Sequence, residues 1–345
     1  MKILFAGLGS IGRRHLRNLL ALGEDDILLY RTHKSTLADD ELKGFPTETE
    51  LARALAHHPQ AVIIANPTAL HLEVALAAAE AGCHLFIEKP ISHTLQGVDA
   101  LFNVVQRNNV RVLVGFQFRF HKGLQKVKQW LQEGVIGQTL TLRAHYGDYL
   151  PGWHPWEDYH HSYSARVDLG GGVVLTLSHP LDYCRWLLGE VQSLYAFTAR
   201  QQDLDIDVED TAEIGLRFAN GVLGSVHLNY LQRPSTHWLQ VAGSEGVIHW
   251  NYERDEVKLH HLSQPERVIC GAQPDIRNPM FLAEMRHFLA VVRGEEESAC
   301  TLDDGMHALE LALAVQQSSA EKRFIDLTNK DIKRYKENKF KDNSP

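Results

Sequence analysis

The sequence predicts an α/β protein in which a doubly wound parallel sheet is followed by an α+β part with a large open, mostly antiparallel sheet. Residues 1–115 alternate short apolar runs with helical patterns and short links. Later residues carry strand alternation and hairpin-turn pairs. The length of 345 residues suits two domains. We expect a first domain over 1–120, a second over 121–328 and a polar, lysine-rich tail over 329–345.

In the N-terminal part, five short apolar runs predict strands, and helical spacing fills the segments between them. A strand that is followed by a helix and then by another strand favours parallel pairing. The strands are expected at Lys2–Ala6, Ile27–Tyr30, Ala61–Ala65, Leu85–Ile87 and Arg111–Gly115, and the helices at Ile11–Leu22, Leu51–Ala56, Leu70–Ala81 and Leu95–Arg107.

In the C-terminal part, successive strand patterns follow one helical segment, and helices return near the end. The pairs Asn220-Gly221 and Glu245-Gly246 are typical of hairpin turns, which favours antiparallel pairing. The strands are expected at Thr139–Tyr146, Thr211–Phe218, Val222–Tyr230, Trp238–Gly243 and Gly246–Trp250, and the helices at Lys122–Glu133, Met280–Arg293 and Gly305–Glu321.

Composition and charge exclude several classes of function. The net charge of -8 argues against a nucleic-acid partner. The 4 cysteines are scattered, so neither a disulfide framework nor a structural zinc site is expected, and a reducing, cytoplasmic compartment fits best. No apolar run resembles a signal peptide or a membrane span. The 20 histidines form no metal-ligand spacing such as HxxxH, so no metal is expected.

A glycine-rich motif, Gly7-Leu8-Gly9-Ser10-Ile11-Gly12, directly follows the first strand and opens the first helix. In the GxGxxG pattern the glycines allow a tight turn, close approach of the backbone to a pyrophosphate, and close contact of helix and strand. The helix N-terminus adds free N–H groups and partial positive charge. Glycines also mark ordinary turns. In this strand and helix context the motif predicts a Rossmann-type dinucleotide site that includes Ser10 and Ile11.

The end of the second expected strand bears on the choice between NAD and NADP. Proteins that bind NAD usually have Asp or Glu there, which hydrogen-bonds the ribose 2′-hydroxyl. This chain has Tyr30-Arg31-Thr32-His33-Lys34 instead. A guanidinium and an ammonium suit a 2′-phosphate, although the same residues could form a solvated basic loop. We therefore expect Arg31 and Thr32 to contact the cofactor. We expect NADP(H) to be favoured, with NAD(H) as the alternative cofactor.

Four further segments carry a resemblance to a known family. Ala65–His71, Ala81–His84 and Glu88-Lys89-Pro90, together with Gly115–Phe120, closely resemble the glucose–fructose oxidoreductase/inositol dehydrogenase (Gfo/Idh/MocA) family. That resemblance implies that Lys89 lies beside nicotinamide and substrate, and that Pro90 is a cis proline. It also implies a substrate contact for Arg119 and cofactor contacts for Asn66, Pro67, Thr68, His71, Glu88, Lys89 and Gln117. Capping or packing beside the cofactor loop is the alternative role of His71.

The same resemblance assigns a catalytic role to His179, which follows Gly170-Gly171-Gly172. An imidazole titrates near working pH, which suits proton transfer, although a packed helical histidine is the plainer alternative. Helical spacing predicts that Thr176, His179 and Asp182 share a face directed at substrate. Many relatives have Asp four residues before the histidine, where this chain has Leu175, so Thr176 is a candidate replacement. Pro180 is expected to kink or start the helix.

The long loop Tyr149–Arg166 is rich in aromatic residues and histidine, a composition that suits a carbohydrate lid, with Trp153 and Arg166 as substrate contacts. A packed loop or a subunit contact is the alternative. The resemblance implies hydride transfer between nicotinamide C4 and a hydroxyl or keto carbon of a sugar, with a nucleotide-linked sugar as the leading class and a homodimer or homotetramer as the assembly. Two other functions stay open: an NAD-dependent glycosidase of the same fold, and a non-catalytic dinucleotide sensor.

Overall fold

The computed structural model describes residues 1–32, 37, 39–154, 158–201, 204–270 and 277–328. The chain forms two compact units, and neither is continuous in sequence. The first consists of Met1–Phe120, Asp168–Gly170 and Arg277–Leu309, and the second of His121–Val167, Gly171–Ile276 and Glu310–Pro345. The expected tail over 329–345 lies outside the described residues.

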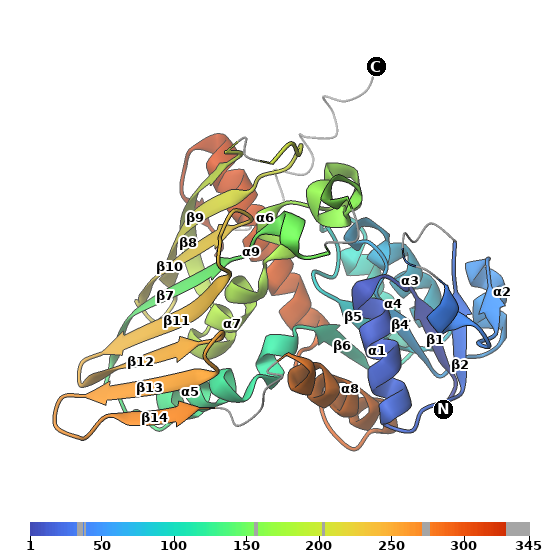
Figure 1. The fold of residues 1–345 in the computed structure, drawn as a ribbon, viewed down its shortest axis with the longest axis horizontal. Coiled ribbons are helices and arrows are strands. Elements are labelled where there is room, and N and C mark those ends of the chain that lie inside the picture. The colour runs from blue at the N-terminus through green and yellow to red at the C-terminus, as the bar shows by residue number, and fades with distance from the viewer. Residues whose placement is uncertain (33–36, 38, 155–157, 202–203, 271–276, 329–345) are drawn as a thin grey trace. The chain divides into compact units, whose positions relative to one another are not determined.

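The first unit is built on a six-stranded parallel sheet in the order β3-β2-β1-β4-β5-β6 (Figure 1). The chain winds outward from β1 on one side and from β4 on the other, which makes the sheet doubly wound, as predicted. Its strands are β1 (Ile3–Ala6), β2 (Ile27–Tyr30), β3 (Thr47–Glu48), β4 (Ala61–Ile64), β5 (His84–Glu88) and β6 (Val112–Gly115).

Helices cover this sheet because its strands are apolar on both faces. All residues of β1, β4 and β6 are buried, as expected for a parallel sheet with helices on each side. The helix α8 also belongs to this unit and packs against α1, although it comes from late in the sequence. The helices of the unit are α1 (Ser10–Ala21), α2 (Leu51–Ala56), α3 (His71–Glu80), α4 (Val98–Arg107) and α8 (Asn278–Arg293), with short 3₁₀ turns η1 (Asp40–Leu42), η2 (Thr68–Leu70) and η3 (Gln117–Phe120).

The second unit contains a nine-stranded sheet in the order β14-β13-β12-β11-β7-β10-β9-β8-β15. Neighbouring strands are antiparallel except for β7 and β10, which are parallel. The expected large, mostly antiparallel sheet is thus confirmed. The predicted turns at Asn220-Gly221 and Glu245-Gly246 join β9 to β10 and β11 to β12. The strands are β7 (Thr139–Gly147), β8 (Val191–Ala199), β9 (Thr211–Phe218), β10 (Leu223–Asn229), β11 (Thr236–Gly243), β12 (Gly246–Asn251), β13 (Glu256–His261), β14 (Arg267–Cys270) and β15 (Ile325–Asp326).

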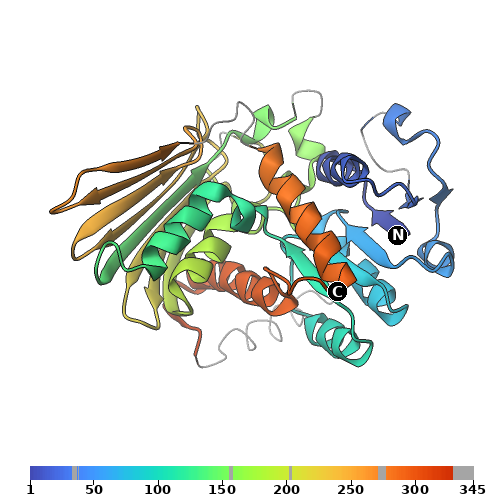
Figure 2. The ribbon, with the colours of Figure 1, turned by 90° about the horizontal axis from the view of Figure 1, so that it is seen from below.

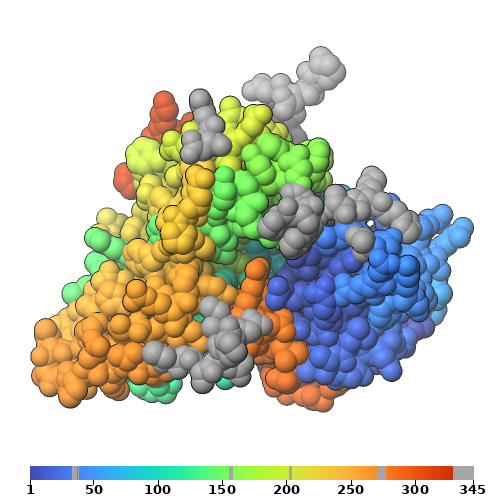
Figure 3. All heavy atoms as spheres, in the orientation of Figure 1, coloured from blue at the N-terminus to red at the C-terminus, as the bar shows by residue number. Residues whose placement is uncertain are grey.

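One face of this sheet is covered by helices. Figure 2 shows α5 (Lys122–Gln132) and α7 (His179–Leu188) along it, and they contact β12, β13 and β7. Burial alternates along β9, where Ile214 and Leu216 face inward and Arg217 faces outward. Strands β11 to β13 form a continuous surface in the space-filling view (Figure 3). Among the described residues, no helix has the length and apolar character needed to cross a bilayer.

Candidate active site

The turn between β1 and α1 has two glycines that the protein itself requires. Gly7 has a φ of +99°, and a Cβ there would lie 2.2 Å from the Asn66 backbone nitrogen. A Cβ on Gly12 would lie 2.1 Å from the Gly7 carbonyl oxygen. Both contacts are far shorter than real Cβ contacts, so close packing of α1 against the turn and against the loop after β4 explains these glycines.

Gly9 differs, because neither its backbone conformation nor a neighbouring atom requires a glycine there. Its φ is -71°, which any residue adopts, and a Cβ there would meet nothing within 4 Å. Open space therefore borders the backbone at the N-terminus of α1, where Ser10 is exposed and the first turn contains no acidic residue. Free N–H groups beside open space fit a diphosphate group. The turn is thus suited to a dinucleotide on the evidence of its own geometry.

Arg31, at the end of β2, is part of an ion pair. Its Nη2 atom lies 2.5 Å from Oδ1 of Asp39, and Arg13 lies 3.9 Å from the same carboxylate oxygen. The Asp39 side chain is half exposed, whereas the Arg31 side chain is largely buried. The sequence-predicted basic residues His33 and Lys34 lie outside the described residues. Asp39 is a group that motif reading overlooked, because it lies nine positions beyond the end of β2.

The loop after β4 is joined to the segment after β5 by His71. This imidazole is buried, with Nδ1 2.9 Å from the Pro90 carbonyl oxygen and Nε2 2.8 Å from the Asn66 carbonyl oxygen. Burial lowers the pKa of His71, although both backbone contacts oppose that shift. His71 thus positions the backbones of the two segments that carry Asn66 and Lys89.

Lys89 follows directly on β5 and precedes a cis peptide bond to Pro90. The side chain is half-buried, and burial lowers its pKa to about 8, while the neighbouring Glu88 carboxylate opposes the shift. Glu88 is itself buried, and its Oε1 atom lies 2.6 Å from Nε2 of the fully buried His15. Such an ammonium, poised close to neutral pH at the carboxyl end of a parallel strand, can hold or protonate an oxygen.

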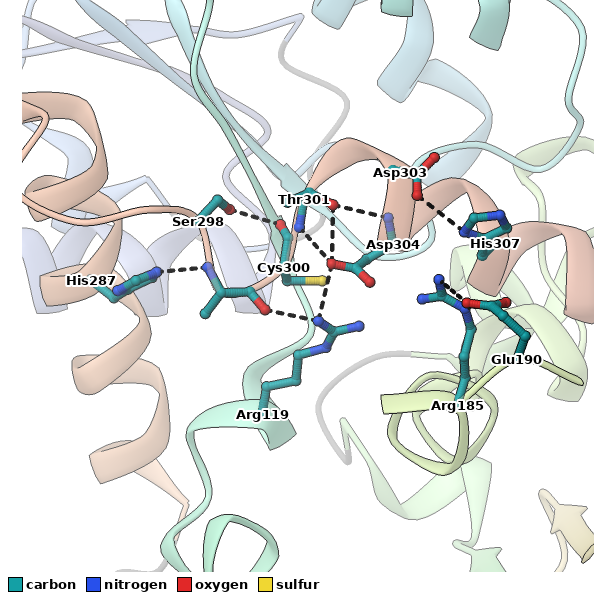
Figure 4. Close-up of polar contacts among 11 residues, drawn as sticks. Arg119, Arg185, Glu190, His287, Ser298, Cys300, Thr301, Asp303, Asp304 and His307 are labelled. Carbon is teal, nitrogen blue, oxygen red and sulfur yellow. Dashed lines mark hydrogen bonds and ion pairs between the residues drawn. The ribbon is translucent and has the colours of Figure 1, made fainter. Parts of the chain in front are cut away.

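Gln117 and Arg119 lie on η3, directly after β6, and both are buried. The Arg119 Nη1 atom donates to the Ala299 carbonyl oxygen at 2.8 Å and lies 3.2 Å from the Asp304 carboxylate. Figure 4 shows the guanidinium directed at Asp304, near the start of α9 (Leu302–Glu321). The structure therefore gives Arg119 an internal partner of opposite charge, which sequence reading did not foresee.

In the second unit, the consecutive glycines pack against the protein. A Cβ on Gly171 would lie 2.4 Å from the Tyr163 carbonyl oxygen. Gly172 has a φ of +106°, and a Cβ there would lie 2.5 Å from Oε1 of Glu209. Glu209 was not singled out by sequence reading, yet its carboxylate accepts hydrogen bonds from the Val174 backbone and from Gln316, both at 3.3 Å. Burial raises the pKa of Glu209.

The helical face expected to hold both Thr176 and His179 is wrong, whereas the expected start of a helix at Pro180 is confirmed. α6 (Val173–Thr176) ends before Leu177, and α7 begins at His179 with Pro180 in its first turn. Thr176 and His179 therefore lie on separate helices and do not share a helical face. Pro180 explains the break, because it has no N–H to donate to the preceding turn and its ring is tolerated only at a helix start.

The side chains of this segment turn inward within the second unit. His179, Thr176 and Asp182 are all buried. The His179 ring centre lies 6.4 Å from that of Tyr146, which is half-buried on β7. Tyr230, whose pKa burial raises well above its usual value, also interacts with Thr176. Thr176 thus has a polar side chain beside it within the second unit.

The loop Tyr149–Arg166 packs partly on itself. The Trp153 ring meets that of Tyr230 edge-on at 5.5 Å between centres. A cavity of about 10 Å³ beneath the loop is lined by Leu150, Trp153, His154, Tyr159 and Ser162, and it has room for about one water. Arg166 is half exposed. Pro155–Glu157 lie outside the described residues. No group of three or more His, Cys, Asp or Glu among the described residues could hold a metal ion.

The glycine turn, Arg31, His71, Glu88 and Lys89 thus all lie in the first unit. The residues around His179 and the loop Tyr149–Arg166 lie in the second unit. A doubly wound sheet with a turn open at Gly9 is the structure of a dinucleotide-binding protein. Residues 1–116 match the model of an oxidoreductase family with an NAD-binding Rossmann fold, and residues 124–249 match that of the Gfo/Idh/MocA C-terminal domain. The chain belongs to the Gfo/Idh/MocA oxidoreductase family.

Individual relatives agree with this assignment. The chain is 30% identical to the myo-inositol 2-dehydrogenase of Thermotoga maritima, over 95% of this chain and 98% of that protein. It is also 30% identical to the levoglucosan dehydrogenase of Pseudarthrobacter phenanthrenivorans, over 64% of this chain and 63% of that one. A structure of levoglucosan dehydrogenase with NADH and levoglucosan is similar with a TM-score of 0.84 and 23% identity, covering 95% and 99% of the two chains, which supports the fold. The predicted family, fold and oxidoreductase class are confirmed.

Proposed function

We propose that the protein is a dehydrogenase or reductase that transfers a hydride between nicotinamide C4 and a hydroxyl or keto carbon of a sugar, free or nucleotide-linked. The observation that carries this proposal is the half-buried Lys89 with a pKa of about 8, which follows β5 in a unit whose glycine turn is open at Gly9. The named relatives act on a cyclic polyol and an anhydrosugar, which supports a polyhydroxylated ring as substrate.

When bound, a nicotinamide cofactor would supply the hydride for reduction or accept it during oxidation. The Lys89 ammonium holds the substrate oxygen and stabilises negative charge as it develops there. His179 donates a proton to that oxygen during reduction and removes it during oxidation. The backbone of Asn66–Thr68, fixed by His71, and Glu88 hold the cofactor side of the site. Thr176, Asp182, Trp153 and Arg166 are proposed contacts of the sugar hydroxyls.

The test is a substrate panel followed by the absorbance of reduced nicotinamide. Oxidation of myo-inositol, levoglucosan and nucleotide-linked sugars is measured with NAD⁺ and NADP⁺, and the matching keto compounds are reduced with NADH and NADPH. Turnover of one class that is lost in Lys89→Met supports the proposal. The matched control is Lys122→Met. Lys122 is exposed, so this replacement should leave turnover unchanged. Cleavage of a glycoside without net change in the dinucleotide would overturn it.

We further propose a preference for NADP(H), with Arg31 as the residue that binds the 2′-phosphate. The support is the absence of an acidic residue at Tyr30-Arg31-Thr32. A phosphate must compete with Asp39 for the Arg31 guanidinium. Asp39→Asn is therefore expected to tighten NADPH binding relative to NADH, and Arg31→Ala to weaken it, in fluorescence titrations. Equal or tighter binding of NADH by the unaltered protein contradicts this preference.

A further inference from the structure

A fully buried carboxyl group that has no assigned role lies on α8. The Glu284 side chain has no solvent exposure, and neither carboxyl oxygen has a hydrogen-bond partner among the described residues. An ionised carboxylate is strongly disfavoured in such surroundings unless it is paired and hydrogen-bonded. Glu284 therefore requires an explanation that packing alone does not give.

The charged neighbour of Glu284 is Glu88, whose negative charge acts on it directly. Glu88 has stabilising partners that Glu284 lacks: His15 Nε2 lies 2.6 Å from its Oε1 atom, and the Lys89 backbone N–H donates to its Oε2 atom at 3.2 Å. The His15 ring that contacts Glu88 itself packs edge-on against the rings of Phe86 and Phe281, with centres 4.8 and 5.9 Å apart.

The other charged groups on the elements that pack against α8 are engaged elsewhere. On α1, the Arg14 guanidinium lies over the Phe281 ring, 5.0 Å from its centre, and also contacts Asn278. On η3, Arg119 contacts Ala299 and Asp304. The residues of β6, Val112–Gly115, carry no titratable side chain. The charge state of Glu284 is thus set chiefly by Glu88 and by burial.

We propose that Glu88 and Glu284 share a single negative charge, with the proton held on Glu284. Two neighbouring buried carboxyl groups do not both ionise, and the proton stays on the one with fewer stabilising contacts. Burial raises the pKa of Glu284 well above its usual value, and the Glu88 charge raises it further. The inference rests on the proposed function only for the importance of Lys89.

The consequence for Lys89 is electrostatic. One adjacent carboxylate raises the pKa of Lys89 and so opposes the effect of burial. A second ionised carboxylate would raise it further and hold the ammonium more firmly in its charged form. With Glu284 neutral, Lys89 titrates close to neutral pH, where an acid–base group is most effective.

The test measures Lys89 itself and needs no substrate. The full chain is reductively methylated with ¹³C, and the dimethyl-lysine signal that disappears in Lys89→Met is titrated by NMR. Glu88→Gln is expected to lower the pKa of Lys89 by about 1 unit or more, whereas Glu284→Gln should change it by less than ~0.3 unit. Glu80→Gln, an exposed acid on α3, is the matched control and should cause no change.

A fall in the Lys89 pKa in Glu284→Gln as large as that in Glu88→Gln would show that Glu284 is charged and overturn the proposal. Glu284→Met provides a second neutral variant. Both are expected to fold and to bind NADH within roughly twofold of the unaltered protein, and failure of both to fold also overturns it. The expected titration without any dehydrogenase activity would leave the carboxyl pair standing and refute only the proposed function.

Discussion

Replacing Gly9 by alanine separates cofactor binding from folding. A methyl group there would meet no protein atom within 4 Å, and the backbone φ of -71° is permitted for alanine. The loss of a preferred N-cap residue costs about 0.5–1 kcal/mol, and the reduced freedom of the unfolded chain returns ~0.4–1 kcal/mol. We therefore expect the free energy of unfolding to change by less than about 0.5 kcal/mol.

Binding should respond much more strongly. If a diphosphate approaches the backbone at Gly9, a methyl group displaces it from at least one charge-assisted hydrogen bond, which is worth about 1.5–3 kcal/mol. That loss corresponds to roughly 10–150-fold weaker dinucleotide binding. Gly7→Ala is the contrasting variant. Its positive φ and its 2.2 Å contact with Asn66 predict a loss of about 2–5 kcal/mol in stability, from backbone strain and overpacking together.

The assay combines urea unfolding with titration of NADH and NADPH by nicotinamide fluorescence. Expected results are normal stability with weak binding for Gly9→Ala, and low stability for Gly7→Ala. If Gly9→Ala binds both dinucleotides as tightly as the unaltered protein, the open space beside Gly9 is not the diphosphate site and the reasoning fails.

Three further predictions concern single side chains. His179→Asn is expected to lower turnover ~10²–10⁴-fold with little change in cofactor affinity, and steady-state kinetics that show normal turnover would end its assignment. Arg119→Ala should cost about 2–4 kcal/mol in urea unfolding, because it leaves the partly exposed Asp304 without its cation; an unchanged midpoint would refute the internal role. Lys89 has its pKa lowered from 10.5 to about 8 in the folded state, so the unfolded chain binds more protons between these values, and stability rises with pH in that window by at most ~1.4 kcal/mol per pH unit. Lys89→Met lacks this dependence on pH. The free energy of unfolding of the unaltered protein should therefore rise relative to that of Lys89→Met between pH 8 and pH 10, and a constant difference between the two proteins would contradict the lowered pKa.

The elements with regular periodicity were predictable from sequence. β9 alternates strictly, and its predicted bounds, Thr211–Phe218, agree with the structure. β8 was not predicted, because it carries large apolar groups on both faces: Leu194 is buried, whereas Phe197 is 65% exposed. A strand that carries large apolar side chains on both faces has no clean period of two to detect.

The candidate site was predictable where its chemistry is local in the chain. The glycine turn and Glu88-Lys89-Pro90 are contiguous motifs, and the sequence placed them at strand ends. The partners of these groups are distant in sequence: Ala299 lies 180 positions beyond Arg119, and Glu284 comes from a segment predicted only as a helix, Met280–Arg293. No local pattern marks such a partner, because only the packing of α8 against α1 brings it close.

The position of α8 in the chain bears on how the protein is made. The first unit takes its last segment from Arg277–Leu309, and the Phe288 ring on α8 lies against Phe86 of β5, with centres 5.6 Å apart. During synthesis the ribosome releases the six strands of the parallel sheet long before it releases that helix. Until then, the apolar surface that α8 covers is exposed, and such surface favours aggregation and chaperone binding. A fragment ending at Phe120 would keep this exposed surface permanently, so we expect the cofactor-binding half to mature only after the second sheet has been synthesised.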